Sequence, residues 1–121
     1  MGNILAQEHF SKGVDAFKKS IKYAKDTPDN KILLGEIYID YGTIYMNVKK
    51  YRQAHKMFKK ALKFFDKNYL VDITNQILCH ERNKTCYELE KWNSKARREK
   101  SKIKKLNKLY TKLQQEYLLL A

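Results

Sequence analysis

Residues that interrupt regular secondary structure are rare in this chain of 121 residues, which contains one proline and four glycines. So few breakers leave little room for β-hairpins or for many short strands, and they favour long helices. No apolar run approaches the roughly 18 residues of a membrane-spanning helix. No basic segment followed by an apolar one opens the chain, as a signal peptide would. We therefore expect an all-α protein, and we do not expect a membrane partner.

Groups that perform chemistry are also scarce. The two cysteines, Cys79 and Cys86, would lie about 10 Å apart on one helix face, which is too far for a disulfide bond. We predict that both are small core residues in a reducing compartment. The histidines lack a metal-binding spacing such as HExxH, and Cys79, His80 and Cys86 lack a fourth ligand. With no glycine-rich phosphate loop either, the sequence predicts no catalytic site, no metal and no cofactor.

Apolar residues recur at steps of three and four along most of the chain, which is the period of a helix with one buried face. Short breaker clusters separate these segments, the clearest being residues 26–30 around Pro28. We predict a single domain over residues 1–121. Its helices are a first helix at 4–26, a complete pair at 31–47 and 51–66, a degenerate helix at 70–90 and a basic heptad helix at 92–120.

The last of these helices carries a heptad pattern, as in a coiled coil. Two alternatives follow: the stripe packs on the neighbouring helices of the same molecule, or it joins two copies of the chain. Lysines flank the stripe, so a parallel homodimer would bring like charges together. The positions alternate steps of four and three, and they are Trp92, Ala96, Glu99, Ile103, Leu106, Tyr110, Leu113, Tyr117 and Leu120.

One spacing of aromatic and small residues occurs twice, 41 residues apart, at Phe10, Gly13, Phe17 and Ser20 and again at Tyr51, Ala54, Phe58 and Ala61. Small residues let helix backbones approach, and the phenylalanine fills the space beside them. The second copy belongs to a longer pattern, Gly42-x2-Tyr45-x8-Ala54-x3-Phe58-x2-Ala61. This pattern resembles the signature of the tetratricopeptide repeat.

The resemblance implies antiparallel helix-turn-helix units that stack on one another. Tyr38, Tyr41 and Asp66 stand where the family has Trp, Leu and Pro, and the 41-residue period resembles that of the longer-helix variants. Few residues precede Phe10, so we expect the first copy to lack its first helix, either because the chain is a piece of a longer array or because another chain completes its first groove. We expect an exposed apolar end there, or a partner or second copy that covers it. The repeat-packing residues are Gly13, Phe17, Gly42, Tyr45, Ala54, Phe58 and Ala61.

In such repeats the first helices of the pairs line a groove that binds an extended peptide or a helix. The resemblance therefore implies a protein or peptide partner and a scaffold or adaptor function. A peptide-sensing regulatory domain is the alternative within the same family. The Lys and Asn pattern that holds a C-terminal carboxylate in chaperone-binding members is not reproduced. The groove positions would be Glu36, Ile39, Thr43, Met46 and Asn47 in one unit, and Ile77, His80, Lys84, Tyr87 and Glu88 in the next.

Positive charge is concentrated near the C-terminal end. The formal net charge is +13, of which residues 91–112 alone carry +9. Such a helix can hold nucleic acid or another polyanion by charge, although a Lys-rich solvated helix is the plainer alternative. The run also resembles a nuclear localisation signal, whereas we expect a cytoplasmic protein. The polyanion-binding candidates are Lys95, Arg97, Arg98, Lys100, Lys102, Lys104 and Lys105.

The opening Met-Gly resembles the start of an N-myristoylation site. Ala6 stands where such a site prefers Ser or Thr, so the match is incomplete. A lipid on Gly2 together with the basic helix would make a two-signal membrane anchor. We keep this as a minor alternative to a protein that acts away from membranes.

Overall fold

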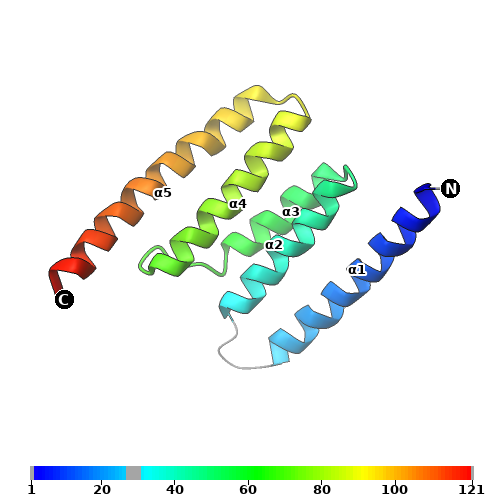
Figure 1. Cartoon of the computed structure of the whole chain (residues 1–121), viewed down its shortest axis with the longest axis horizontal. Coiled ribbons are helices and arrows are strands. Elements are labelled where there is room, and N and C mark those ends of the chain that lie inside the picture. Colours follow the sequence, from blue (N-terminus) through cyan, green and yellow to red (C-terminus); the bar gives the residue numbers. More distant parts are fainter. Residues whose placement is uncertain (1, 27–30, 121) are drawn as a thin grey trace.

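The computed structural model describes the backbone of residues 2–26 and 31–120 and the side chains of residues 10–25 and 31–120 (Figure 1). The described backbone forms five α-helices and no strand. They are α1 (Gly2–Asp26), α2 (Lys31–Asn47), α3 (Tyr51–Leu62), α4 (Leu70–Leu89) and α5 (Asn93–Leu120). This confirms the predicted all-α fold of about five helices with a long C-terminal helix. Residues 27–30 of the predicted break around Pro28 lie outside the described residues.

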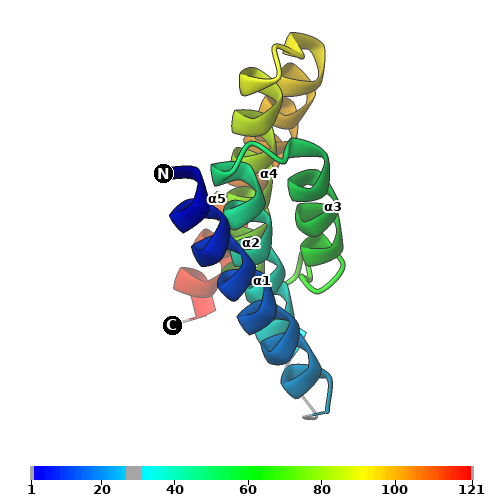
Figure 2. The same ribbon diagram turned by 90° about the vertical axis from the view of Figure 1, so that its right-hand side faces the viewer.

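Successive helices run antiparallel, and α1 and α5 lie at opposite edges of the molecule (Figure 1). In the view turned by 90°, α3 stands out to one side of the other helices (Figure 2). Because α2 contacts α4 as well as α1 and α3, the helix pair α2–α3 stacks directly on the pair α4–α5. Within the described ranges, no helix is both long and apolar enough to cross a membrane.

The α3 helix ends at Leu62, before its predicted end at residue 66. A 3₁₀ turn follows the helix, because the Phe64 amide donates to the Ala61 carbonyl at 3.0 Å. This is the i to i−3 hydrogen bond typical of such a turn. Phe65 then turns inward and lies directly against Gly35, where a Cβ atom would clash with its ring. The periodicity of Phe58 and Phe65 suggested a longer helix, but Phe65 is buried from the connecting segment instead.

Close backbone approach defines the contact between α2 and α3. Phe58 is fully buried, and a Cβ atom at Gly42 would stand 2.6 Å from ring carbon Cε1 of Phe58. Ala54 and Ala61, on either side of Phe58 along α3, are also fully buried. Tyr45 is partly buried beside the same core. The small residues therefore bring the helices together, and the phenylalanine fills the space that Gly42 leaves.

The α1 helix packs on α2 through aromatic pairs. The ring centroids of Phe10 and Tyr45 lie 5.5 Å apart, and those of Phe17 and Tyr41 lie 5.4 Å apart. Gly13 sits between the two phenylalanines and allows Ile44 to approach. Edge-to-face and tilted ring pairs of this kind stabilise helix contacts beyond the area that they bury.

Over residues 10–25, the part of α1 whose side chains the structure describes, no exposed apolar face is found. The exposed side chains described on this helix, over residues 10–25, are mostly lysine and other polar residues. Exposed apolar side chains gather instead at the end of α5, where Leu118, Leu119 and Leu120 are 72%, 87% and 85% exposed. This segment projects past α4 (Figure 1).

Both cysteines lie in the core, as predicted. Cys79 and Cys86 are fully buried on α4. Burial raises the pKa of each thiol to about 12, with smaller contributions from the charges of Glu99 near Cys79 and Glu90 near Cys86. Both therefore remain protonated at neutral pH, and they act as small packing residues rather than nucleophiles.

The heptad stripe of α5 divides into three parts. Its middle packs within the chain, because Ala96 and Leu106 are buried and α5 lies against α4. Its two ends are exposed, with Trp92 at 50% and Leu120 at 85%. Packing within one molecule therefore accounts for the middle of the stripe, and self-association through the end of α5 stays a prediction.

We predict that Gly42→Ala lowers the free energy of unfolding by about 1–3 kcal/mol, because the buried ring of Phe58 has no room to move. The helix propensity of alanine offsets at most about 1 kcal/mol of this loss. Urea denaturation followed by circular dichroism measures the change. Gly13→Ala is the matched control, since its Cβ meets only the flexible end of Ile44 at 3.0 Å, and we expect it to be neutral or stabilising. A Gly42→Ala protein as stable as the parent would contradict the prediction.

Candidate functional site

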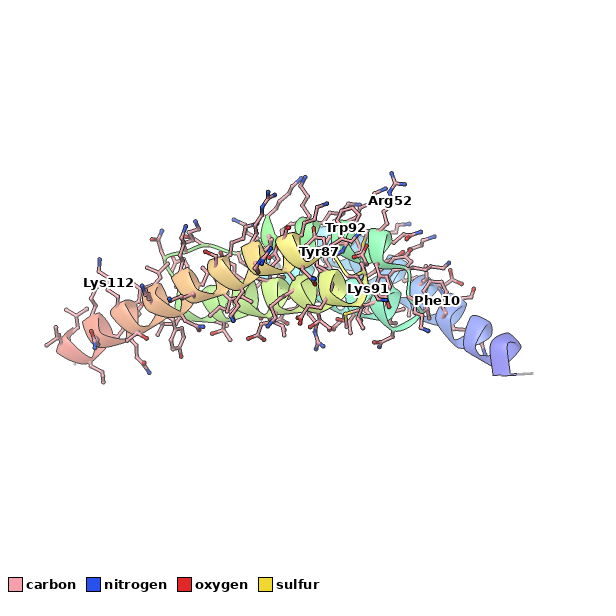
Figure 3. All side chains as sticks on the ribbon, turned by 90° about the horizontal axis from the view of Figure 1, so that it is seen from above. Phe10, Arg52, Tyr87, Lys91, Trp92 and Lys112 are labelled. Carbon is pink, nitrogen blue, oxygen red and sulfur yellow. The ribbon has the colours of Figure 1, made fainter. Side chains whose placement is uncertain are left out.

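A pocket opens where α3, the C-terminal end of α4 and the start of α5 meet. Arg52 and the side chains around the α4–α5 turn, Tyr87, Lys91 and Trp92, gather in this region, far from Lys112 along α5 (Figure 3). The pocket has a volume of about 500 Å³, enough for part of a peptide or a small ligand. We call it the basic pocket, and its lining residues are Arg52, His55, Lys56, Lys59, Asn83, Tyr87, Glu90, Trp92 and Lys95.

His55 connects the walls of the basic pocket. Its Nδ1 lies 2.8 Å from Oδ1 of Asn83, and its Nε2 lies 2.5 Å from Oε1 of Glu90. Both ring nitrogens are therefore engaged, one by each partner. The ring also stacks on Tyr87 with centroids 4.1 Å apart. Through His55, α3 is fastened to two positions near the end of α4.

Lys95, from α5, lies over two aromatic rings that line the pocket. Its Nζ is 3.8 Å from the ring centroid of Trp92 and 5.6 Å from that of Tyr87. Cation–π contacts at these distances hold an ammonium group in place. Burial raises the pKa of Tyr87, with added effects from the charges of Glu99 and Glu90, so its phenol keeps its proton at neutral pH.

The turn between α4 and α5 fixes the position of Trp92. The Trp92 amide donates to the Tyr87 carbonyl at 2.8 Å, and the Lys91 amide donates to the Glu88 carbonyl at 3.0 Å. This pair of bonds is a Schellman motif, in which a left-handed residue ends the helix. Lys91 occupies that position with a φ of 62°, where glycine is usual because a Cβ atom costs about 1–2 kcal/mol. The turn therefore holds Lys91 in a strained backbone conformation directly before the exposed Trp92.

A second histidine explains the acidic residue in the heptad stripe. The Nδ1 of His80 donates to Oε2 of Glu99 at 2.5 Å across the α4–α5 contact, and both side chains are largely buried. Burial alone would raise the pKa of Glu99. The hydrogen bond and charge of His80, helped by Lys102 at 3.5 Å, outweigh that effect and lower the pKa below its usual value. Glu99 is therefore ionised at neutral pH and holds α5 on α4.

The predicted groove residues of α2 divide between surface and core. Glu36 and Asn47 are exposed, whereas Thr43 and Met46 are half-buried. Ile39 is 3% exposed and packs in the core with the two cysteines. Its side chain therefore cannot line an open groove, because α4 covers it.

The predicted groove residues of α4 face other neighbours than α2. His80 binds Glu99 of α5, Tyr87 lines the basic pocket, and Lys84 lies 3.9 Å from Glu88 along the same helix. Arg82 of α4 does act on α2, because its charge partly opposes the rise that burial causes in the pKa of Asp40. The structure does not bring the two predicted sets together in one groove. The 41-residue repeat had aligned α4 with α2, but α4 also packs on α3 and α5, and this changes which side it presents.

The predicted polyanion-binding residues do share one helix surface, with one exception. Lys95 is half-buried against Trp92 and Tyr87, as described above. Lys102 is exposed and pairs with Glu99 at 3.5 Å. The remaining candidates are exposed along α5, and they are Arg97, Arg98, Lys100, Lys104 and Lys105.

Sequence reasoning missed most of the basic pocket. Arg52, Lys56 and Lys59 recur at steps of four and three, so they occupy one side of α3. That spacing is visible in the sequence, but the apolar stripe that identified α3 lies on the other side of the helix. The approach of α3 to Trp92 depends on how the two helix pairs stack, and no local signal reports it.

Among the described residues, no three His, Cys, Asp or Glu side chains gather in a way that could hold a metal ion. Comparison with protein-family models, with curated proteins and with solved structures found no match to this chain. The geometry of the described residues therefore provides the basis for a functional proposal.

We predict that Glu99→Gln lowers the free energy of unfolding by about 1–3 kcal/mol near neutral pH, because a buried charged hydrogen bond is lost. The pKa of Glu99 in the folded protein lies below its usual value of 4.5. Its stabilisation is therefore complete above that pH and disappears as pH falls through the lower folded pKa. Urea denaturation at about pH 7 and about pH 3 measures both values.

The stability difference between the parent and Glu99→Gln should shrink in acid. Glu116→Gln, an exposed carboxylate on the same helix, is the control and should leave stability nearly unchanged at both pH values. A difference for Glu99→Gln that stays constant across this pH range would show that its ionisation is not what fastens α5.

Proposed function

We propose that this chain is a non-catalytic helical-repeat module, a scaffold or adaptor that binds a segment of a partner protein. The observation that carries the proposal is the packing of α2 on α3. Gly42 lies against the ring of Phe58, which is fully buried. Ala54 and Ala61, on either side of Phe58 along α3, are also fully buried. These are the positions through which the tetratricopeptide-like signature stacks its helices. Repeats of this kind present extended surfaces to protein partners.

The surface that we assign to the partner is the exposed side of α2. It comprises Glu36, Asp40 and Asn47, which are exposed, and Thr43, which is half-buried. Arg82 of α4 adds a positive charge beside it. A surface of carboxylates, a hydroxyl and an amide suits the backbone and polar side chains of an extended peptide. A peptide-sensing regulatory role would use the same surface.

Selection of displayed random peptides against the whole chain tests this proposal. We expect enriched peptides whose binding weakens about tenfold or more in the double variant Glu36→Arg, Asp40→Arg, because both carboxylates reverse their charge. The control is Glu81→Arg, Glu116→Arg, which makes the same charge change at exposed positions of α4 and α5. Failure to enrich any peptide, or equal loss in both variants, would contradict the assignment.

A second candidate function is polyanion binding along α5. It is supported by the exposure of Arg97, Arg98, Lys104 and Lys105 on one long helix. Few carboxylates lie near them to neutralise their charge, so an extended phosphate backbone could contact several at once. Self-association is a further proposal, supported by the exposed leucines at the end of α5.

Fluorescence anisotropy with a labelled single-stranded oligonucleotide tests the second candidate. We expect affinity that falls steeply with salt and is lost when Arg97, Arg98, Lys104 and Lys105 become glutamate. The control replaces Lys18, Lys19, Lys22 and Lys25 of α1 by glutamate, with the same change in net charge. The candidate fails if affinity survives the α5 changes or if the α1 changes abolish it equally.

A further inference from the structure

The basic pocket has an excess of positive charge that its own residues do not neutralise. Arg52, Lys56 and Lys59 form a row on α3, and Lys95 faces the pocket from α5. The one carboxylate in the lining is Glu90, and it is engaged by His55 at 2.5 Å. A hollow with cations on two walls concentrates its field on an anion that enters it.

Several of these groups are held in place before any ligand binds. Lys95 rests on the rings of Trp92 and Tyr87, and the Schellman turn at Lys91 sets the position of Trp92. His55 is fixed by Asn83 and Glu90 on its two ring nitrogens. Because less side-chain freedom is lost on binding, such groups favour a ligand more than mobile surface lysines do.

The aromatic side chains indicate which class of anion fits. Base stacking on single-stranded nucleic acid needs an open ring face. Tyr87 is covered by His55 at 4.1 Å, and Lys95 lies over both Tyr87 and Trp92. The ring faces that His55 and Lys95 occupy are therefore closed to bases, and Trp92 keeps half of its surface exposed. Carboxylates need no ring face, and they pair directly with arginine and lysine.

The spacing of the α3 row fits an extended acidic peptide. Residues 52 and 56 are separated by about 6 Å along the helix axis, at about 1.5 Å per residue. Alternate side chains of an extended chain are about 7 Å apart and point to the same side. Two carboxylates on alternate residues can therefore reach successive cations of the row, while Trp92, half exposed at 50%, provides an apolar contact beside them.

We propose that the basic pocket binds an extended acidic segment of a partner protein, through Arg52, Lys56 and Lys95, with Trp92 as the contact at its edge. The inference rests on the proposed function only in that the partner is a protein. The pocket lies on α3, α4 and α5, so it is a second site apart from the exposed side of α2. A partner could occupy both surfaces or the pocket alone.

Trp92 is the single tryptophan of the chain, so its fluorescence reports directly on the pocket. The probe is a synthetic eight-residue peptide of alternating Glu and Ser, titrated into the whole chain while tryptophan emission is recorded. We expect a saturable change in emission and a matching affinity by anisotropy of a labelled peptide. The same peptide with Gln in place of Glu should produce no saturable change.

Two matched variants locate the site. Arg52→Glu, Lys56→Glu should weaken peptide binding about tenfold or more, while Arg52→Gln, Lys56→Gln should give an intermediate loss. The control Lys18→Glu, Lys22→Glu makes the same charge change on α1 and should have little effect. Circular dichroism checks that each variant remains folded, which we expect because the substituted side chains are exposed.

Three results would overturn the proposal: no saturable response of Trp92, equal loss in the α3 and α1 variants, or tighter binding of an oligothymidine of equal charge with the same response. The first two exclude a specific site, and the third assigns the pocket to nucleic acid. Peptides selected on the exposed side of α2 should be unaffected by the α3 variants. That result separates failure of this inference from failure of the proposed function.

Discussion

The close contact between Gly42 and Phe58 is the constraint on which the rest of the structure depends. The absence of a side chain at Gly42 lets the ring of Phe58 fill the space between α2 and α3. With α2 and α3 held together, one side of α2 receives the aromatic residues of α1, and another side places Ile39 against the cysteines of α4. A bulkier residue at this point would separate the pair and shift both neighbouring contacts, because close-packed interiors do not yield locally.

Much of the fold could be predicted from local pattern. Periods of three and four residues identified the helices, and the Gly42–Ala61 spacing identified the pair that packs through Gly42 and Phe58. The end of α3 was missed because Phe65 continues the helical apolar period yet is buried from a turn, against Gly35. That burial depends on a residue of the previous helix, which a scan along α3 does not see.

The candidate sites were harder to predict, because they form between helices rather than along one. Ile39 and His80 were expected on a shared surface, but one is covered by α4 and the other binds Glu99 of α5. Glu99 stood out in the sequence as the one charged residue in an apolar stripe, although nothing local named its partner. The basic pocket needs Arg52 of α3 and Lys95 of α5 to meet. Their proximity follows from how the two helix pairs stack.

The two walls of the basic pocket belong to different helix pairs, and this has a mechanical consequence. Arg52, Lys56 and Lys59 belong to the pair α2–α3, whereas Trp92 and Lys95 belong to the pair α4–α5 and the turn within it. A ligand that bridges the walls must therefore favour one angle between the pairs, and a change of that angle must alter the affinity of the ligand by the same free energy. The angle between the helix pairs and the affinity of a ligand that bridges them are thus linked. His55 joins α3 to Asn83 and Glu90, so it lies at the contact between the two pairs.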